Sequence, residues 1–209
     1  LYNTDPYPET RPGRTERERL ELKVAFAKAV MRAIKGADPK GVWVCSGWAM
    51  LDSAYWPREH VRAFLEAIPS DDFRIWDLWC DRRPLYKDPR INFWWGRKWE
   101  FTVLNSFGGC DRLHGDVRFL IERAREVASD PRAKRCVGFG LQPEMVHFNT
   151  LFFELAAHLA WNPSLDFDRF LLDFCERRYG PGSAKAMVEC WRRVVEACHG
   201  RDDFGEAHY

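Results

Sequence analysis

The strongest constraint on the fold is an alternation of short apolar segments with longer stretches whose apolar residues are spaced as in a helix. The short segments recur at intervals of roughly thirty residues, the size of a βα unit in a parallel sheet. They lie at 42–45, 73–76, 101–104 and 136–141. The first helical stretch opens with the capping box Thr15-x-x-Glu18. This order predicts an α/β fold with a parallel sheet.

The length of the chain limits how much of such a sheet it can contain. A closed (β/α)8 barrel of the TIM type needs about 250 residues and eight units. The chain has 209 residues, and its four units follow the end of a preceding strand near its start. We therefore expect four or five parallel strands in an open sheet, forming a partial barrel over residues 1–161. Only helical patterns follow, so residues 162–209 are expected to begin an all-α domain.

Composition excludes several classes of partner. Lys and Arg number 32 and Asp and Glu number 31, so the net charge does not favour nucleic acid or an anionic membrane surface. No run of eighteen apolar residues is present, and no membrane span is expected. Seven cysteines without a Cys-x-x-Cys pair do not predict a zinc site. Neither a metal nor an organic cofactor is expected.

Two glutamates are the best candidates for chemistry. Glu9 and Glu144 each follow an apolar segment within a proline-containing turn. In a parallel barrel the carboxyl ends of the strands face one mouth. Two converging carboxylates there would be equipped for glycosidic-bond hydrolysis. Taken singly, Glu9 is also compatible with a solvated loop acid, and Glu144 with an acid stabilised near a helix N-terminus.

Aromatic and polar residues near the same strand ends would suit a sugar. Aromatic faces can cover the apolar face of a pyranose, while carboxylates and amides bind its hydroxyl groups. The candidates are Trp48, Asp77, Tyr86, Trp99 and Asn105. Tyr86 and Trp99 fall in a long non-helical stretch, 79–100, interpreted as a site-forming insertion. For Trp48 and Trp99 a packing role remains open, and Asp77 is also compatible with capping the following turn.

Several motifs stand in an order that carries a family resemblance. They are Tyr-x-x-Asp-x-Tyr-x-Glu at 2–9, Val-Trp-Val-x-x-Gly-Trp at 42–48, Asp-Leu at 77–78, Pro-x-Tyr at 84–86, Phe-Gly-Gly at 107–109, Gly-x-Gly-x-x-Pro-Glu at 138–144 and Arg-Tyr-Gly at 178–180. In this order the chain resembles the alpha-N-acetylglucosaminidase family of glycoside hydrolases.

The resemblance implies the C-terminal half of a (β/α)8 barrel, followed by the first helices of a helical domain. It also implies a retaining exo-glycosidase that releases terminal α-linked N-acetylglucosamine. Glu9 then matches the acid/base, Glu144 the nucleophile, and Trp48 a tryptophan of the sugar pocket. The implied partners are a glycan or glycoconjugate substrate and the remainder of a parent chain, without which the fragment is expected to be inactive. The implied location is lysosomal, secreted or periplasmic.

Departures from the family pattern keep two alternatives open. Pro8 replaces the usual Asn before the acid/base, Asn105-Ser106 replaces His-Asn, Cys110 replaces an Asn-like residue and Met145 replaces Gly. The first alternative is a divergent, catalytically weak homologue that only binds carbohydrate. The second is an α-glycosidase that acts on another sugar.

Overall fold

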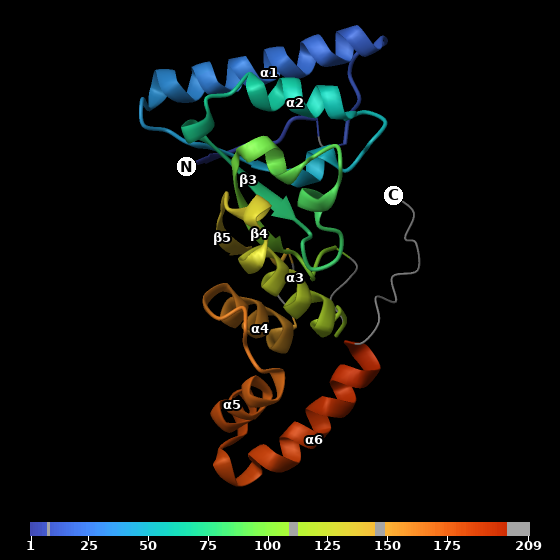
Figure 1. Ribbon diagram of the computed structural model, residues 1–209, viewed down its shortest axis with the longest axis vertical. Helices are drawn as coiled ribbons and strands as arrows, with labels where there is room; N and C mark the ends of the chain where they lie inside the picture. The colour runs from blue at the N-terminus through green and yellow to red at the C-terminus, as the bar shows by residue number, and fades with distance from the viewer. Residues whose placement is uncertain (8, 109–112, 145–148, 200–209) are drawn as a thin grey trace. The chain divides into compact units, whose positions relative to one another are not determined.

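The computed structural model describes residues 1–7, 9–108, 113–144 and 149–199 (Figure 1). Pro8, Cys110 and Met145, which depart from the family pattern, lie outside the described residues. The chain divides into two compact units. Unit 1 comprises Leu1–Trp79, Pro84–Thr102 and Pro131–Gly140, and unit 2 comprises Cys80–Arg83, Val103–Asp130 and Leu141–Tyr209. A domain boundary at residue 161 stays a prediction.

Five strands form one open sheet in the order in which they occur along the chain. The strands are β1 (Tyr2–Asn3), β2 (Trp43–Ser46), β3 (Phe73–Leu78), β4 (Lys98–Val103) and β5 (Cys136–Leu141). The pairs β1–β2, β2–β3 and β3–β4 are parallel. Successive parallel neighbours joined by helices are the arrangement of a TIM barrel. The fold class expected from the sequence, a partial TIM barrel with additional helices, is confirmed.

The start of β4 was predicted wrongly. The sequence analysis began this strand at Phe101, whereas the structure begins it at Lys98. Trp99 and Glu100 therefore belong to the sheet and not to the preceding insertion. The segment Lys-Trp-Glu-Phe-Thr-Val alternates between partly and fully buried positions over its first four residues. The sequence alternates in the same way between charged and aromatic residues at 98–101. This period of two is a strand signal, although the continuous apolar run begins only at Phe101.

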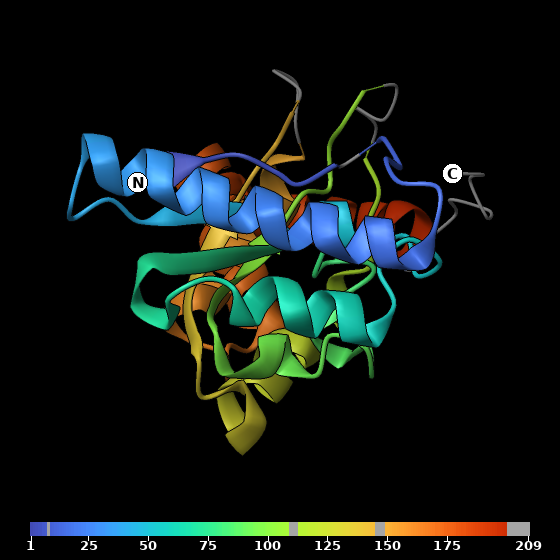
Figure 2. The same cartoon turned by 90° about the horizontal axis from the view of Figure 1, so that it is seen from above.

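In the described part of the chain, six α-helices accompany the sheet. They are α1 (Glu16–Ala37), α2 (Arg58–Glu66), α3 (Val117–Ser129), α4 (Thr150–Trp161), α5 (Phe167–Tyr179) and α6 (Pro181–Cys198). In unit 1, α1 and α2 lie side by side (Figures 1 and 2). In unit 2, α5 packs on α6, and the two meet at Gly180, whose φ of 78° suits a residue without a side chain. None of the described helices is long and apolar enough to cross a membrane.

A local signal in the sequence placed the start of α1 correctly. The capping box at Thr15 and Glu18 is formed, with Glu18 N–H donating to Thr15 Oγ1 at 3.2 Å and Thr15 N–H donating to Glu18 Oε2 at 3.1 Å. Helix α6 begins at Pro181, directly after Gly180. Proline fits a first helical turn, where its missing N–H has no partner to lose.

An aromatic cluster forms the core of unit 1. The Trp43 ring meets Phe64 of α2 edge-on at 5.7 Å and Phe73 of β3 at 5.1 Å. All three side chains are fully buried, and each contributes roughly 1.5–3 kcal/mol through burial. The Trp43 indole N–H donates to Thr4 O at 2.8 Å. The core therefore also fixes the chain just beyond β1.

A buried lysine ties α1 to the loop before α2. Lys23 Nζ donates to Tyr55 O at 2.7 Å, lies 3.0 Å from His60 Nδ1, and sits 3.6 Å from the centre of the Tyr55 ring. Burial, assisted by repulsion from Arg19, lowers the pKa of Lys23 to about 8. Burial and then the Lys23 charge lower the pKa of His60. Because an ammonium group only donates, Nδ1 of a neutral His60 accepts this bond.

This lowered pKa predicts a pH dependence of stability. Unfolded chains keep the Lys23 proton up to about 10.5, whereas the folded protein loses it near pH 8. Because the unfolded state binds more protons in that window, stability should rise with pH. We expect the unfolding free energy of the wild type, relative to Lys23→Met, to rise by up to about 3 kcal/mol between pH 8 and 10.5.

Denaturant unfolding of the full-length protein at several pH values measures this difference. Lys28→Met, at an exposed position of the same helix, is the matched control and should leave the pH profile unchanged. A profile for Lys23→Met that runs parallel to the wild type would show that the buried amine does not titrate in this range.

Candidate functional site

Glu9 lies on a loop that is tethered on both sides. Before it, Asp5 Oδ1 accepts the Ser46 N–H at 2.7 Å, which joins the end of β1 to the end of β2. After it, Pro12 O accepts the Tyr55 hydroxyl at 2.9 Å. Burial raises the pKa of Asp5, and the Ser46 N–H opposes that shift to a smaller extent. Glu9 itself is exposed on this loop, and its catalytic role stays a prediction.

Trp48 lies on the short 3₁₀ turn Gly47–Met50 that follows β2 directly. Ser46 Oγ accepts the Trp48 N–H at 3.2 Å, and the Trp48 ring lies 5.5 Å from the Trp79 ring at a tilt of 54°. The side chain is half-buried. Its remaining exposed surface is what a stacking role would need, and that role stays a prediction.

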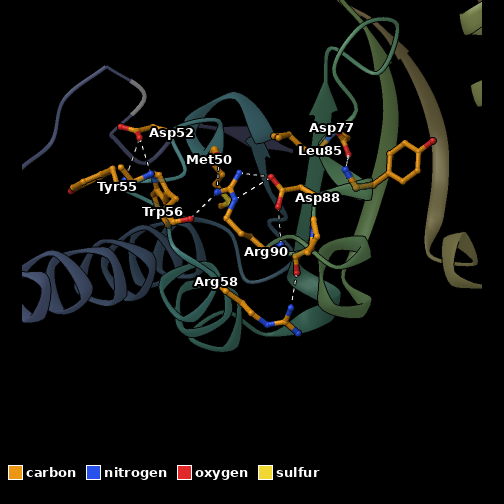
Figure 3. Close-up of polar contacts among 12 residues, drawn as sticks. Met50, Asp52, Tyr55, Trp56, Arg58, Asp77, Leu85, Asp88 and Arg90 are labelled. Carbon is orange, nitrogen blue, oxygen red and sulfur yellow. Dashed lines mark hydrogen bonds and ion pairs between the residues drawn. The ribbon is translucent and has the colours of Figure 1, made fainter.

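Asp77 acts as an acceptor for the loop that follows β3. Its carboxylate, fully buried, accepts the Leu85 N–H at 3.0 Å (Figure 3), the Tyr86 N–H at 2.6 Å and the Trp94 indole N–H at 2.9 Å. Carboxylates make stronger hydrogen bonds to such donors than neutral acceptors do. The structure therefore gives Asp77 a supporting role in fixing the loop, which is the capping alternative considered from the sequence. A direct sugar contact stays a prediction that this burial does not favour.

Tyr86 and Trp99 form an interior stack. Their rings lie 4.8 Å apart at an interplanar angle of 23°, and the residues are 1% and 0% exposed. Trp99 comes from β4 and Tyr86 from the 3₁₀ turn Leu85–Lys87. In this structure neither ring offers a face to a ligand. The stack packs the inserted loop against the sheet, and substrate contact by either ring stays a prediction without structural support.

Residues 92–96 form a left-handed turn. Asn92, Phe93, Trp94 and Trp95 have φ between 48° and 57°, and Gly96 has a φ of 76°. Such backbone costs roughly 1–2 kcal/mol for each residue with a side chain. The Trp94 ring also approaches Gly47 closely, since a β-carbon there would lie 3.0 Å from Trp94 Cη2. Side-chain contacts of the tryptophans therefore hold a strained turn beside the Trp48 backbone.

An arginine that sequence reasoning missed joins two loops of unit 1. Arg90 Nη1 donates to Trp56 O at 2.8 Å and to Met50 O at 3.3 Å, while Nη2 pairs with Asp88 Oδ2 at 2.6 Å (Figure 3). Arg58 adds a bond from Nη1 to Pro89 O at 2.7 Å. These contacts link the loop after β2 to the loop after β3. No local motif predicts the bonds to Trp56 O, Met50 O and Pro89 O, because donor and acceptor lie more than thirty residues apart in each of them.

In unit 2, Glu144 follows β5 and is exposed. Its N–H donates to Ser106 O at 2.9 Å. Asn105 lies just beyond β4, with a φ of 46°, and its side-chain amide donates to His114 O at 3.2 Å. The structure thus brings the Glu144 backbone to the Asn105–Ser106 segment. The catalytic role of Glu144 and the binding role of Asn105 stay predictions.

Asp81 is a second buried aspartate that the sequence analysis did not select. Its carboxylate oxygens accept the Leu104 N–H at 3.0 Å and the Asn105 N–H at 3.2 Å. The residue stands in the polar stretch Cys80–Arg83, and from the sequence alone a charged side chain there is expected to be exposed to solvent. Only the fold reveals that it is buried against the end of β4.

Within the parts of the chain that the structure describes, no cluster of three or more His, Cys, Asp and Glu side chains could hold a metal ion. The described cysteines at positions 45, 136, 175, 190 and 198 are free thiols.

Comparison with known proteins gives one consistent family. The sequence profile of the alpha-N-acetylglucosaminidase (NAGLU) TIM-barrel domain matches residues 1–163. Human alpha-N-acetylglucosaminidase is 28% identical over 213 residues, covering 97% of this chain and 28% of the human protein.

Solved structures of a family 89 glycoside hydrolase from Clostridium perfringens share the fold. The complex with 2-acetamido-1,2-dideoxynojirmycin matches with a TM-score of 0.75 and 24% identity, covering 98% of this chain and 21% of that one. The complex with its substrate GlcNAc-alpha-1,4-galactose matches with a TM-score of 0.73 and 23% identity over the same shares. The chain thus spans less than a third of the length of these relatives.

The three bonds to Asp77 predict a large loss of stability on their removal. Asp77→Ala leaves three buried N–H donors without an acceptor, and each such donor costs about 1–3 kcal/mol. We expect the unfolding free energy to fall by about 3 kcal/mol or more. Thermal and urea unfolding of the full-length protein, followed by tryptophan fluorescence, measures the change.

Asp166→Ala is the control for this measurement. Asp166 is exposed and accepts a single amide, the Arg169 N–H at 2.8 Å, so its loss should cost about 1 kcal/mol. Equal losses for the two variants would contradict the supporting role of Asp77.

Proposed function

The chain belongs to the alpha-N-acetylglucosaminidase family, and from that premise we propose that its protein hydrolyses α-linked N-acetylglucosamine at the ends of glycans. The observation that carries this proposal is the family match over residues 1–163, which includes both candidate glutamates. The clostridial relative is solved with GlcNAc-alpha-1,4-galactose as its substrate. That complex supports the same sugar for this chain.

Membership of the family implies a shared site for the two glutamates. Glu9 follows β1 and Glu144 follows β5, the first and last strands of the sheet. In a closed eight-stranded barrel, strands four positions apart face each other, and all carboxyl ends open on one mouth. Two glutamates on such strands would approach a glycosidic bond from opposite sides.

The proposed mechanism is a double displacement with retention of configuration. Glu144 attacks the anomeric carbon as a carboxylate, and the bond from that carbon to the leaving oxygen breaks. Glu9 donates its proton to the leaving oxygen. Glu9 then removes a proton from water, which attacks the same carbon and breaks the ester to Glu144. The cycle returns both carboxyl groups to their starting states.

The two exposed glutamates and the half-buried Trp48 fit the division of labour that this chemistry needs. A reacting carboxylate must reach the substrate, whereas a carboxylate that supports the backbone can be buried. Trp48 would cover one face of the sugar ring, as its place in the family motif implies. The proposal names no residue of this chain as the contact for the N-acetyl group.

The proposal predicts distinct defects for the two glutamates. In the full-length protein, Glu144→Gln should lower kcat for an aryl α-N-acetylglucosaminide by at least about 10³-fold, because it removes the nucleophile. Glu9→Gln should slow hydrolysis similarly for a poor leaving group. It should spare the first step for a dinitrophenyl aglycone, which departs without protonation. Glu66→Gln, at an exposed position of α2, is the control and should match the wild type.

A panel of aryl α-glycosides separates the proposal from its rivals. Cleavage of the N-acetylglucosaminide supports the proposed activity, and cleavage of a different sugar alone supports altered specificity. Sugar binding without cleavage, with Glu144→Gln behaving like the wild type, would identify a carbohydrate-binding homologue and contradict the proposal.

A further inference from the structure

The turn that follows β4 is held by a residue from a distant part of unit 2. Asp81, which is 5% exposed, accepts the N–H groups of Leu104 and Asn105 at 3.0 and 3.2 Å. One carboxylate oxygen serves each amide. A planar carboxylate that binds two successive amides fixes both the position and the direction of the backbone.

The turn at Leu104–Ser106 contains features that are unfavourable without support from elsewhere. Asn105 has a φ of 46°, in the left-handed region that residues with side chains rarely adopt. Ser106 N–H closes the turn by donating to Leu104 O at 2.6 Å. Asn105 Oδ1 and Ser106 Oγ are buried and have no hydrogen-bond partner among the described residues, and the two residues are 1% and 2% exposed. Unpaired buried polar atoms are unfavourable, so the turn depends on the bonds that Asp81 supplies.

The segment that carries Glu144 is hydrogen-bonded to the end of β4 and to the same turn. Gln142 N–H donates to Val103 O at 2.9 Å, and Glu144 N–H donates to Ser106 O at 2.9 Å. These two bonds extend the pairing beyond the end of β5 up to the candidate nucleophile. A shift of the turn would therefore move the Glu144 backbone with it.

We propose that Asp81 is a positioning residue for Glu144: it fixes the Leu104–Ser106 turn, whose carbonyl group sets the place of the Glu144 backbone. This inference rests on the proposed function, in which Glu144 is the nucleophile. Misplacement of a reacting group by about 1 Å can lower a rate by about 10²-fold. Asp81 thus contributes to the rate without touching the substrate.

The variant Asp81→Asn in the full-length protein tests this role, because it keeps the shape but turns an acceptor oxygen into a donor. We expect kcat to fall about 10–100-fold, with little change in KM. The loss should be equal for aryl glycosides with good and poor leaving groups, because attack by Glu144 is needed for both. A defect confined to poor leaving groups would place the effect at Glu9 and overturn the proposal.

Asp116→Asn is the matched control. Asp116 lies in the same unit, and its carboxylate also accepts one backbone amide, the Phe119 N–H at 2.9 Å at the start of α3. Its kcat should stay within about twofold of the wild type. A double-mutant cycle with Glu144→Asp adds a readout that a general loss of stability would not move. If Asp81 acts through Glu144, the two losses should combine to less than their product.

Hydrogen exchange tests the positioning role of Asp81 independently of the proposed hydrolase activity. Asp81→Asn should speed exchange at the Glu144 amide by at least about tenfold, since the bond to Ser106 O loosens, and Asp116→Asn should not. Wild-type protein that cleaves no α-glycoside would contradict the proposed function alone, and exchange would still decide the position of Glu144.

If Asp81→Asn does not fold, Asp81→Glu retains the charge and displaces the turn. Wild-type kcat and exchange in either folded variant would overturn the proposal.

Discussion

Aspartates that are buried or half-buried and accept backbone N–H groups hold the carboxyl ends of the strands in place. Where the sheet ladder ends, each further buried amide needs another acceptor. Asp5 provides it for Ser46, Asp77 for Leu85 and Tyr86, and Asp81 for Leu104 and Asn105. In each case a short, charged side chain joins the end of one strand to a segment elsewhere in the same compact unit. The loops that carry the candidate site residues start from these bonds.

The acidic side chains near the ends of the strands differ in burial and fall into two groups. Asp77 and Asp81 are buried and bonded to backbone amides, whereas Glu9 and Glu144 are exposed. A carboxylate can be buried at tolerable cost only where donors replace its water, so the buried pair is committed to supporting the backbone. The aromatic side chains divide in the same way. Tyr86 and Trp99 stack in the interior, while half-buried Trp48 keeps surface available.

Local patterns in the sequence predicted most of the fold, and long-range contacts account for what they missed. The strand at 136–141, the capping box at Thr15 and the family resemblance are confirmed, because each depends on residues close in the chain or on motifs in order. The supporting role of Asp81 depends on amides 23 and 24 residues away. The stack of Tyr86 on Trp99 depends on where β4 begins. Neither is visible until the chain is folded.

The proposed function requires that this chain supply both carboxylates of a retaining glycosidase. The most direct test is the anomeric configuration of the sugar that the full-length protein releases first. Proton NMR measures this configuration immediately after an aryl α-N-acetylglucosaminide is added. Double displacement through Glu144 predicts that the α-anomer appears first and the β-anomer later, by mutarotation. Initial appearance of the β-anomer would show a single displacement by water. That outcome requires carboxyl groups about 6.5–9.5 Å apart and would contradict a covalent role for Glu144.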